Sequence, residues 1–360
     1  MIDVFGSVRG LLKLDAVCID NNIFRLHYKV TVIVLATFSV IVTTRQYVGD
    51  PIDCLVHDMP THIMDSYCWV HSTFTVNNKV HARIGKDAVQ PGVGPYVEGK
   101  DEVTYHKYYQ WVCFVLFFQA VCFYIPRYLW KTLEGGRIQA LVANLRVVML
   151  DKEQKSKSIS QLVEYFIDNL HTHNIYLMWY YICEMLNFVN VFTQMTFLNY
   201  FFEGEFGLYG LDVFRFTAMD PRERGDPMSR IFPKVAKCTF EQYGSSGTIQ
   251  KVDGLCLLPL NVLNEKIYVF LWFWFLFIAV LSSFSLVYRT AVVISSKFRF
   301  LLLRKKSRLS PRNKLIAINE QFNIGDWFIL CQIGKNCDAV IFNELISNLA
   351  NHFNGIIEDV

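Results

Sequence analysis

The chain has 360 residues, of which 52% are hydrophobic and 19% are charged, and its formal net charge is only +3. Its mean hydropathy is +0.25. A composition this apolar excludes an ordinary soluble domain of this length and predicts several membrane spans.

The N-terminal segment, residues 1–25, lacks the uninterrupted apolar core of a cleaved signal peptide, because charged residues such as Asp3, Arg9 and Lys13 interrupt it. We therefore expect membrane insertion to begin with the first span. The segment also carries apolar residues near helical spacing, which predicts a short helix with one apolar side. These residues are Val4, Val8, Leu11 and Leu12.

Four stretches carry almost no charge and predict membrane spans. A helix rises about 1.5 Å per residue and the hydrocarbon core is about 30 Å thick, so about 20 apolar residues suffice. The stretches are Val30 to Thr44, Tyr108 to Pro126, Tyr176 to Phe202, which contains Glu184, and Ile267 to Tyr288. We assign four transmembrane helices to residues 26–45, 108–130, 176–202 and 267–288.

The distribution of Lys and Arg predicts how these spans are oriented. Within twenty residues of the span ends, 15 basic residues fall on the side that contains the N-terminus and 7 on the other side. Cytoplasmic flanks are enriched in Lys and Arg, so both termini are expected in the cytoplasm. Only the flanks of the third span favour the opposite orientation. This prediction places two loops outside the cell, residues 46–107 and 203–266, and leaves residues 131–175 and 289–360 inside.

The cysteines separate by predicted compartment. Cys54 and Cys68 lie in the first outside loop, Cys238 and Cys256 lie in the second, and the other six lie in the membrane or the cytoplasm. Four cysteines in an oxidising space predict two disulfides, and their spacing leaves three connectivities open. The alternative is a zinc site that includes nearby histidines, although their spacing fits no standard site. These histidines are His57, His62 and His71.

The third span carries polar residues on one helical face, at Glu184, Asn187 and Gln194. A carboxylate within a membrane marks a functional position by default, and it either faces water or has a charged partner. The alternative, which we favour, is that Glu184 joins Asn187 and Asn190 in hydrogen bonds between helices.

Beyond the fourth span the chain is first basic and then amphipathic. The run RKKSR, Arg304 to Arg308, predicts contact with anionic lipid, with a calmodulin-binding or nuclear-import signal as the alternative. Two later stretches, SPRNKLIAINEQF and DAVIFNELISNLANHF, have apolar residues at helical spacing. The expected fold is an all-α polytopic membrane protein with four transmembrane helices, a small disulfide-linked extracellular layer and a helical cytoplasmic dome.

A five-residue signature, YYQWV, stands at the start of the second span and consists of Tyr108, Tyr109, Gln110, Trp111 and Val112. Around it lie GDPIDC at 49–54, YCW at 67–69, VQPGVG at 89–94, DPMSRIFPKVAKCTFEQYG at 226–244, DGLCLLPLNVLNEKIYVFLWFW at 253–274 and FNIGDWF at 322–328. In this order, and with two cysteines in each outside loop, these motifs resemble those of the innexins, the invertebrate gap-junction proteins, and of their arthropod members above all. The resemblance covers almost the whole chain.

The resemblance implies a channel and not an enzyme. Innexins assemble as rings of subunits around a pore, with eight subunits expected here. Rings in apposed plasma membranes dock through their outside loops into a gap junction that passes ions and small metabolites, and an undocked ring can act as a hemichannel. The expected partners are copies of this chain, other innexins and membrane lipids, without nucleic acid. No catalysis, cofactor or metal is implied.

The same resemblance implies a disulfide pairing between the two loops, Cys54 with Cys256 and Cys68 with Cys238. These loops would form the docking layer.

The resemblance also implies that the N-terminal segment folds into the channel mouth, which makes Met1, Ile2 and Asp3 the expected pore-lining residues. Asp3, repeated around the ring, would then set the electrostatic field at the mouth. As the alternative, Asp3 caps the N-terminus of the short helix.

Two other functions stay open on the sequence alone. A four-span scaffold or adhesion protein would also have outside cysteines but would not conduct. A non-docking release channel is the second. The sequence contains no N-x-Ser/Thr sequon, so the outside loops carry no N-glycan that would keep another protein at a distance, and this favours docking.

Overall fold

The computed structural model describes residues 17–57, 59–80, 90–97, 99–145, 152–218 and 227–358. The expected pore-lining residues Met1, Ile2 and Asp3 lie outside the described residues. Contacts between residues divide the chain into two units. The helical unit comprises residues 1–31, 122–190 and 278–360, and the sheet unit comprises residues 32–121 and 191–277.

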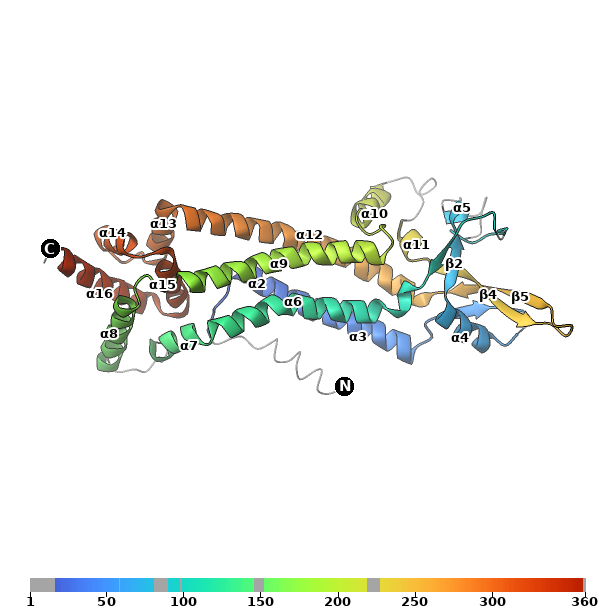
Figure 1. Ribbon diagram of the computed structural model, residues 1–360, viewed down its shortest axis with the longest axis horizontal. Coiled ribbons are helices and arrows are strands. Elements are labelled where there is room, and N and C mark those ends of the chain that lie inside the picture. Colours follow the sequence, from blue (N-terminus) through green and yellow to red (C-terminus); the bar gives the residue numbers. More distant parts are fainter. Residues whose placement is uncertain are drawn as a thin grey trace. The chain divides into compact units, whose positions relative to one another are not determined.

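Among the residues that the structure describes, four helices are long and apolar enough to cross a membrane, which confirms the four predicted spans. The first, Asn22–Val48, consists of α2 (Asn22–Arg25), a π-helical segment (Leu26–Thr31) and α3 (Val32–Val48). The others are α6 (Val112–Glu134), α9 (Asn174–Phe201) and α12 (Pro259–Ile294) (Figure 1). With 36 residues, α12 exceeds the roughly 20 residues that a bilayer requires, so it extends beyond the hydrocarbon core.

Helix α6 differs from the predicted span at both ends. Tyr108–Gln110 form a separate 3₁₀ turn, so α6 begins at Val112, and it continues past Pro126 to Glu134. Pro126 has no N–H to donate to the carbonyl one turn earlier. A membrane helix tolerates this gap because neighbouring groups can satisfy the freed carbonyl.

The sheet unit holds a five-stranded antiparallel sheet in the order β1-β5-β4-β2-β3. Its strands are β1 (Asp53–Leu55), β2 (Thr73–Val76), β3 (Val103–His106), β4 (Val235–Tyr243) and β5 (Ile249–Leu257) (Figure 1). The first loop supplies three strands and the second supplies the long β4–β5 hairpin. The sequence prediction of a small folded layer included no strands. The TFTV sequence of β2 alternates polar and apolar residues, which is a strand signal, although all four side chains are buried.

Short helices accompany the sheet. They are α4 (Thr61–His71), α5 (Asn77–Val80), α10 (Tyr209–Ala218) and α11 (Pro227–Ile231). Helix α10 lies directly against α12, because a Cβ atom added to Gly210 would come within 2.1 Å of the Trp272 ring. Only glycine permits this approach of the α10 backbone.

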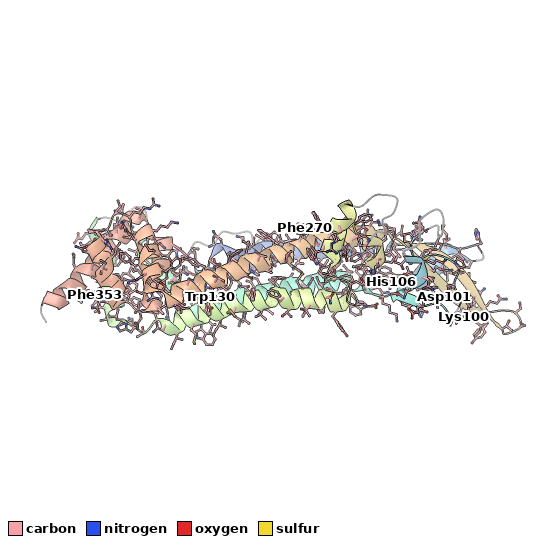
Figure 2. The ribbon with its side chains drawn as sticks, turned by 90° about the horizontal axis from the view of Figure 1, so that it is seen from above. Lys100, Asp101, His106, Trp130, Phe270 and Phe353 are labelled. Carbon is pink, nitrogen blue, oxygen red and sulfur yellow. A yellow bond between two sulfur atoms is a disulfide. The ribbon has the colours of Figure 1, made fainter. Side chains whose placement is uncertain are left out.

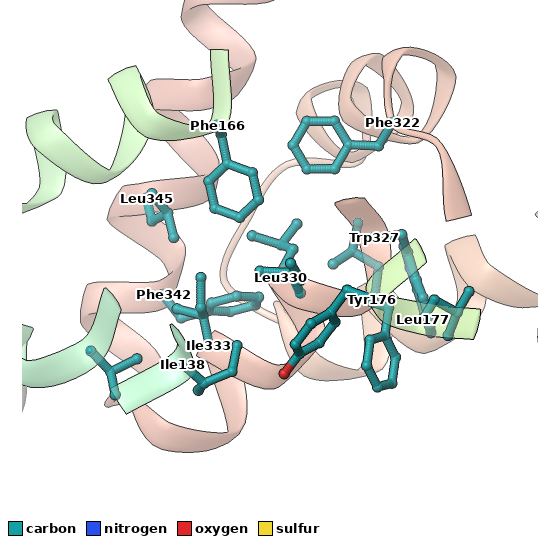
Figure 3. Packing of buried hydrophobic residues seen from close by; sticks show 14 of the residues in the cluster. Ile138, Phe166, Tyr176, Leu177, Phe322, Trp327, Leu330, Ile333, Phe342 and Leu345 are labelled. Carbon is teal, nitrogen blue, oxygen red and sulfur yellow. The ribbon is translucent and has the colours of Figure 1, made fainter. Parts of the chain in front are cut away.

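The helical unit adds a layer of shorter helices to the long ones. They are α7 (Arg137–Val142), a 3₁₀ turn (Ala143–Leu145), α8 (Lys152–Asp168), α13 (Ser296–Lys306), α14 (Arg312–Gln321), α15 (Ile324–Asn336) and α16 (Ala339–Glu358). The amphipathic helices predicted beyond the fourth span are confirmed. Leu345, Leu349 and Phe353 bury one face of α16, and this helix packs with α8 and α15 through Phe166, Leu330 and Phe342 (Figure 3).

The FNIGDWF motif joins α15 to the turn that precedes α9. Asp326 and Asn323 form a capping box at the start of α15. Asp326 also accepts hydrogen bonds from His173 Nδ1 (2.6 Å) and from the backbone N–H of His171 (3.0 Å). A Cβ atom on Gly325 would lie 2.3 Å from the His173 carbonyl carbon, so this motif needs both its glycine and its carboxylate.

Candidate functional site

Two disulfides bind the two loops of the sheet unit together. Cys54 of β1 lies opposite Cys256 of β5 in the strand register, with their Sγ atoms 2.08 Å apart. Cys68 of α4 is bonded to Cys238 of β4 at 2.01 Å. These are the two pairs that the family resemblance implies. All four cysteines are buried in an apolar cluster completed by Ile52, Met64, Tyr109, Ala236 and Leu258.

The same sulfur atoms are the metal-binding candidates of the sheet unit. The Sγ atoms of Cys54, Cys68 and Cys256 all lie within 4.8 Å of one another. Each is oxidised in a disulfide, whereas a metal such as zinc binds thiolates. The cluster therefore acts as a covalent link between the loops.

The YYQWV signature connects this cross-linked layer to α6. The Tyr109 hydroxyl donates a hydrogen bond to the carbonyl oxygen of Cys68 (3.1 Å), and the Gln110 side chain donates to the carbonyl oxygen of Trp69. The Tyr109 and Trp69 rings also lie 4.9 Å apart. Burial raises the pKa of Tyr109 to about 12, so its hydroxyl keeps the proton that it donates. The signature thus fixes α4, which carries Cys68, to the start of α6.

The remaining signature residues divide between core and surface. Tyr108 packs edge-on against Phe202 (5.4 Å between centroids) and Phe232 (5.6 Å), and Val112 is fully buried. Trp111, in contrast, is 60% exposed. An exposed indole beside the end of a membrane helix is typical of the boundary between lipid and water.

His106 ends strand β3 and is labelled in Figure 2. It is buried in the sheet, where its Nε2 lies 2.8 Å from Thr75 Oγ1. Burial lowers the pKa of His106 to about 4, so the ring is neutral near pH 7.

The helical unit contains a buried ion pair that joins α9 to α12. Arg289 Nε lies 2.8 Å from Glu184 Oε2, and Arg289 Nη2 lies 3.0 Å from Glu184 Oε1. Asn21, whose Oδ1 caps α2, donates a further hydrogen bond to Glu184 (2.6 Å). Charges in apolar surroundings need such partners. The sequence does not reveal this partnership, because no local pattern links residues 105 positions apart.

A second buried carboxylate lies close to the start of the first long helix. Asp20 is 1% exposed and contacts Arg25 (2.8 Å) and Arg127 of α6 (3.0 Å). The Arg127 guanidinium also lies over the Tyr28 ring, 4.8 Å from its centroid. Together with the Glu184 pair, this cluster connects all four long helices within the helical unit.

The basic run after the fourth span is only partly available to lipid. Arg304, Lys305 and Arg308 are exposed, but Lys306 donates to the Cys331 carbonyl oxygen, and burial lowers the pKa of Lys306 to about 8. Ser307, considered above as part of a surface run, is 1% exposed, and its hydroxyl lies 2.5 Å from Asn343 Oδ1.

Comparison with known proteins assigns the family. A family model described as Innexin matches residues 20–353. The chain is 59% identical over 355 residues to innexin inx2 of Schistocerca americana, which covers 99% of both chains. It is 58% identical to innexin inx2 of Drosophila melanogaster, over 99% of this chain and 97% of the relative. Its identity to the Drosophila innexin shaking-B is 44%, over 98% of this chain and 95% of the relative. The four membrane-crossing helices, the paired loop cysteines and these matches together show that the chain belongs to the innexin family.

Proposed function

We propose that this protein is a subunit of a gap-junction channel, in which rings of subunits in apposed plasma membranes dock and pass ions and small metabolites. The observation that carries the proposal is the single sheet that both loops build and that two disulfides lock. Cross-linking two loops into one layer limits their conformational freedom, and a preorganised surface loses less entropy when it binds a partner. Family membership supports the same function.

In this proposal the two loops that build the sheet lie outside the cell and both chain termini lie in the cytoplasm. The bias of Lys and Arg toward the flanks next to the helical unit supports this orientation. Two disulfides in the sheet unit support it as well, because disulfides persist in oxidising compartments.

The assembly is proposed to be a ring of eight copies, with other innexins as co-subunits and membrane lipid around it. The N-terminal segment, with Met1, Ile2 and Asp3, is proposed to line the mouth of the pore. Channel function needs neither a cofactor nor a catalytic residue.

Paired-cell electrical recording tests the proposal directly. The protein is expressed as the only added junctional component in two touching cells, and current between the cells is measured together with transfer of a small dye. Intercellular current is the expected result. Silence in paired cells and in single membranes, despite surface expression, would replace the channel with a four-span scaffold. Current in single membranes alone would indicate a release channel that does not dock.

A further inference from the structure

The sheet unit contains a groove whose lining includes none of the disulfide cysteines. It lies where β3, the YYQWV turn, the end of α9 and α11 meet, and its volume is about 300 Å³, at the lower limit of the range of about 300–1,000 Å³ typical of small-molecule sites. Its lining combines aromatic rings with two cations and two carboxylates, namely Tyr105, Trp111, Lys107, Arg230, Glu203 and Glu205.

The charges of this groove balance but do not all neutralise one another. Arg230 is paired with Glu205 at the surface. Within the residues that the structure describes, neither Lys107 nor Glu203 forms an ion pair. His106, which also lines the groove, adds no charge near pH 7, since burial lowers its pKa to about 4. The groove therefore offers one available cation and one available anion without net charge.

The backbone fixes Glu203 at this place. Glu203 and Gly204 both have positive φ, 54° and 92°, and the Gly204 N–H donates to the Asn199 carbonyl oxygen (2.7 Å). This left-handed pair ends α9 and turns the chain sharply.

An exposed apolar stripe leads away from the groove along α6. Trp111 lies at the groove, and its ring is 6.0 Å from that of Phe114, which is 55% exposed. The stripe continues to Phe118, which is 56% exposed and lies 6.5 Å from Phe197 of α9. Because α6 and α9 are membrane-crossing helices, this stripe is suited to contact acyl chains.

We propose that the groove binds the headgroup of a phosphatidylcholine-type zwitterionic phospholipid. The phosphate lies against Lys107, the quaternary ammonium lies against Glu203 and the exposed aromatic rings, and the acyl chains follow the stripe on α6. Cationic side chains bind phosphate by charge-assisted hydrogen bonds, and aromatic faces attract quaternary ammonium groups. An anionic headgroup without the ammonium would leave Glu203 facing like charge, so the site selects against it. The inference rests on the proposed function, in which this chain spans a membrane.

Photo-crosslinking in vesicles tests the site. The full-length protein is reconstituted in vesicles of a glycolipid that has neither phosphate nor ammonium, with a small fraction of a phosphatidylcholine that carries a photoreactive headgroup, and labelled peptides are mapped. Labels are expected at residues 104–111 and 201–205. Lys107→Gln and Glu203→Gln should each lower labelling roughly three- to fivefold, the scale of a solvent-exposed charged contact. Lys100→Gln, an exposed lysine of the same unit (Figure 2), is the matched control and should label like the wild type.

Competition experiments distinguish a zwitterionic lipid headgroup from an anionic headgroup or free phosphate as the ligand. Excess unlabelled phosphatidylcholine should remove the label, whereas phosphatidylglycerol or inorganic phosphate should not. Equal competition by either of these, labels elsewhere, or full labelling of both groove variants would overturn the inference. Melting curves of the variants exclude misfolding as the cause of lost labelling. Paired-cell currents are recorded in parallel. If the protein conducts but its groove is not labelled, the lipid site is wrong and the channel function stands. If the groove is labelled but no current passes, the channel function is wrong and the lipid site stands.

Discussion

At the scale of single residues, buried ionisable side chains determine how the protein responds to pH and to substitution. Glu184 is only 5% exposed and contacts a guanidinium. His106 is 6% exposed and neutral near pH 7, with a hydroxyl as its partner. Protonation of His106, or loss of one partner of the Glu184 pair, would leave a buried unpaired charge, which costs several kcal/mol.

His106 should make the sheet unit sensitive to acid. Its folded pKa of about 4 lies below the ordinary value of 6.5, so its contribution to stability is complete above pH 6.5 and is lost as the pH falls toward 4. At pH 5.5 the loss is about 1 kcal/mol. His106→Gln keeps a hydrogen-bonding group near Thr75 but cannot titrate. Thermal melting of the purified protein at pH 7.5 and 5.5 should therefore show a smaller acid shift for this variant.

The exposed His62 provides the control for this measurement, and His62→Gln should melt with the acid shift of the wild type. An acid shift that is the same in the His106 variant as in the wild type would show that another group is responsible.

The pair between Glu184 and Arg289 should be strongly coupled. Glu184→Gln leaves the buried Arg289 charge without its carboxylate, and such a change costs about 3–5 kcal/mol. Adding Arg289→Gln removes that unpaired charge, so the double variant should be more stable than the Glu184→Gln single variant. Chemical denaturation in detergent of both single variants and the double variant measures the coupling. Additive effects of the two substitutions would contradict a direct buried pair.

At the scale of elements, the disulfides make α4 and β1 part of the sheet. Cys68 ties α4 to β4, and Cys54 ties the three-residue β1 to β5. A strand this short contributes few ladder hydrogen bonds, so its position depends on the covalent link and on the packing around it.

Loss of either disulfide should damage docking before membrane insertion. Cys54→Ser or Cys68→Ser should abolish intercellular current while surface expression persists, because insertion depends on the apolar helices. Cys331→Ser in α15 is the control and should conduct, since Cys331 is a free cysteine. Paired-cell recording with surface labelling measures both quantities. Full coupling in Cys68→Ser would show that this link does not shape the docking surface.

The long helices and the amphipathic tail could be predicted from sequence because their signals are local. A run of apolar residues or a face such as Leu345, Leu349 and Phe353 is visible within one window. The sheet could not be predicted in this way, since β1 pairs with β5 across 202 residues. The partnership of Glu184 with Arg289 likewise depends on how α9 packs against α12, and a short sequence window does not include both residues.

At the scale of the whole molecule, ring symmetry would repeat every surface feature around one axis. A charge near that axis and an exposed side chain on the docking face therefore both act in several copies.

Asp3 should set the ion preference of the pore. Asp3→Asn removes a proposed ring of negative charge at the channel mouth, so the ratio of cation to anion permeability should fall while assembly survives. Reversal potentials in salt gradients measure the ratio. Glu164→Gln, an exposed carboxylate on α8, is the control. An unchanged ratio would favour the role of Asp3 as a helix cap.

The β4–β5 hairpin should contribute to docking. Tyr243 and Ile249 are paired next to its turn and are 80% and 62% exposed, as expected for side chains that become buried against another ring. Ile249→Asp should lower intercellular conductance about tenfold or more, since burial of one such side chain contributes about 1.5–3 kcal/mol. Currents in single membranes should persist.

Leu309→Asp, at a leucine of the helical unit that is 72% exposed, is the control for this substitution. Equal loss of current in single membranes and in cell pairs would point to failed assembly and not to failed docking.

The strand order also determines when parts of the sheet can form during biosynthesis. Strand β1 has β5 as its neighbour in the sheet, and Cys54 must wait for Cys256, 202 residues later. At a translation rate of about 5–20 residues per second, the nascent chain carries this reduced cysteine and unpaired strand for about 10–40 s. A ribosome that stops before β4 leaves the edge of β2 open and both early cysteines without their native partners. Premature termination products should therefore be retained by the folding machinery as mixed disulfides, even when their first two membrane helices are inserted.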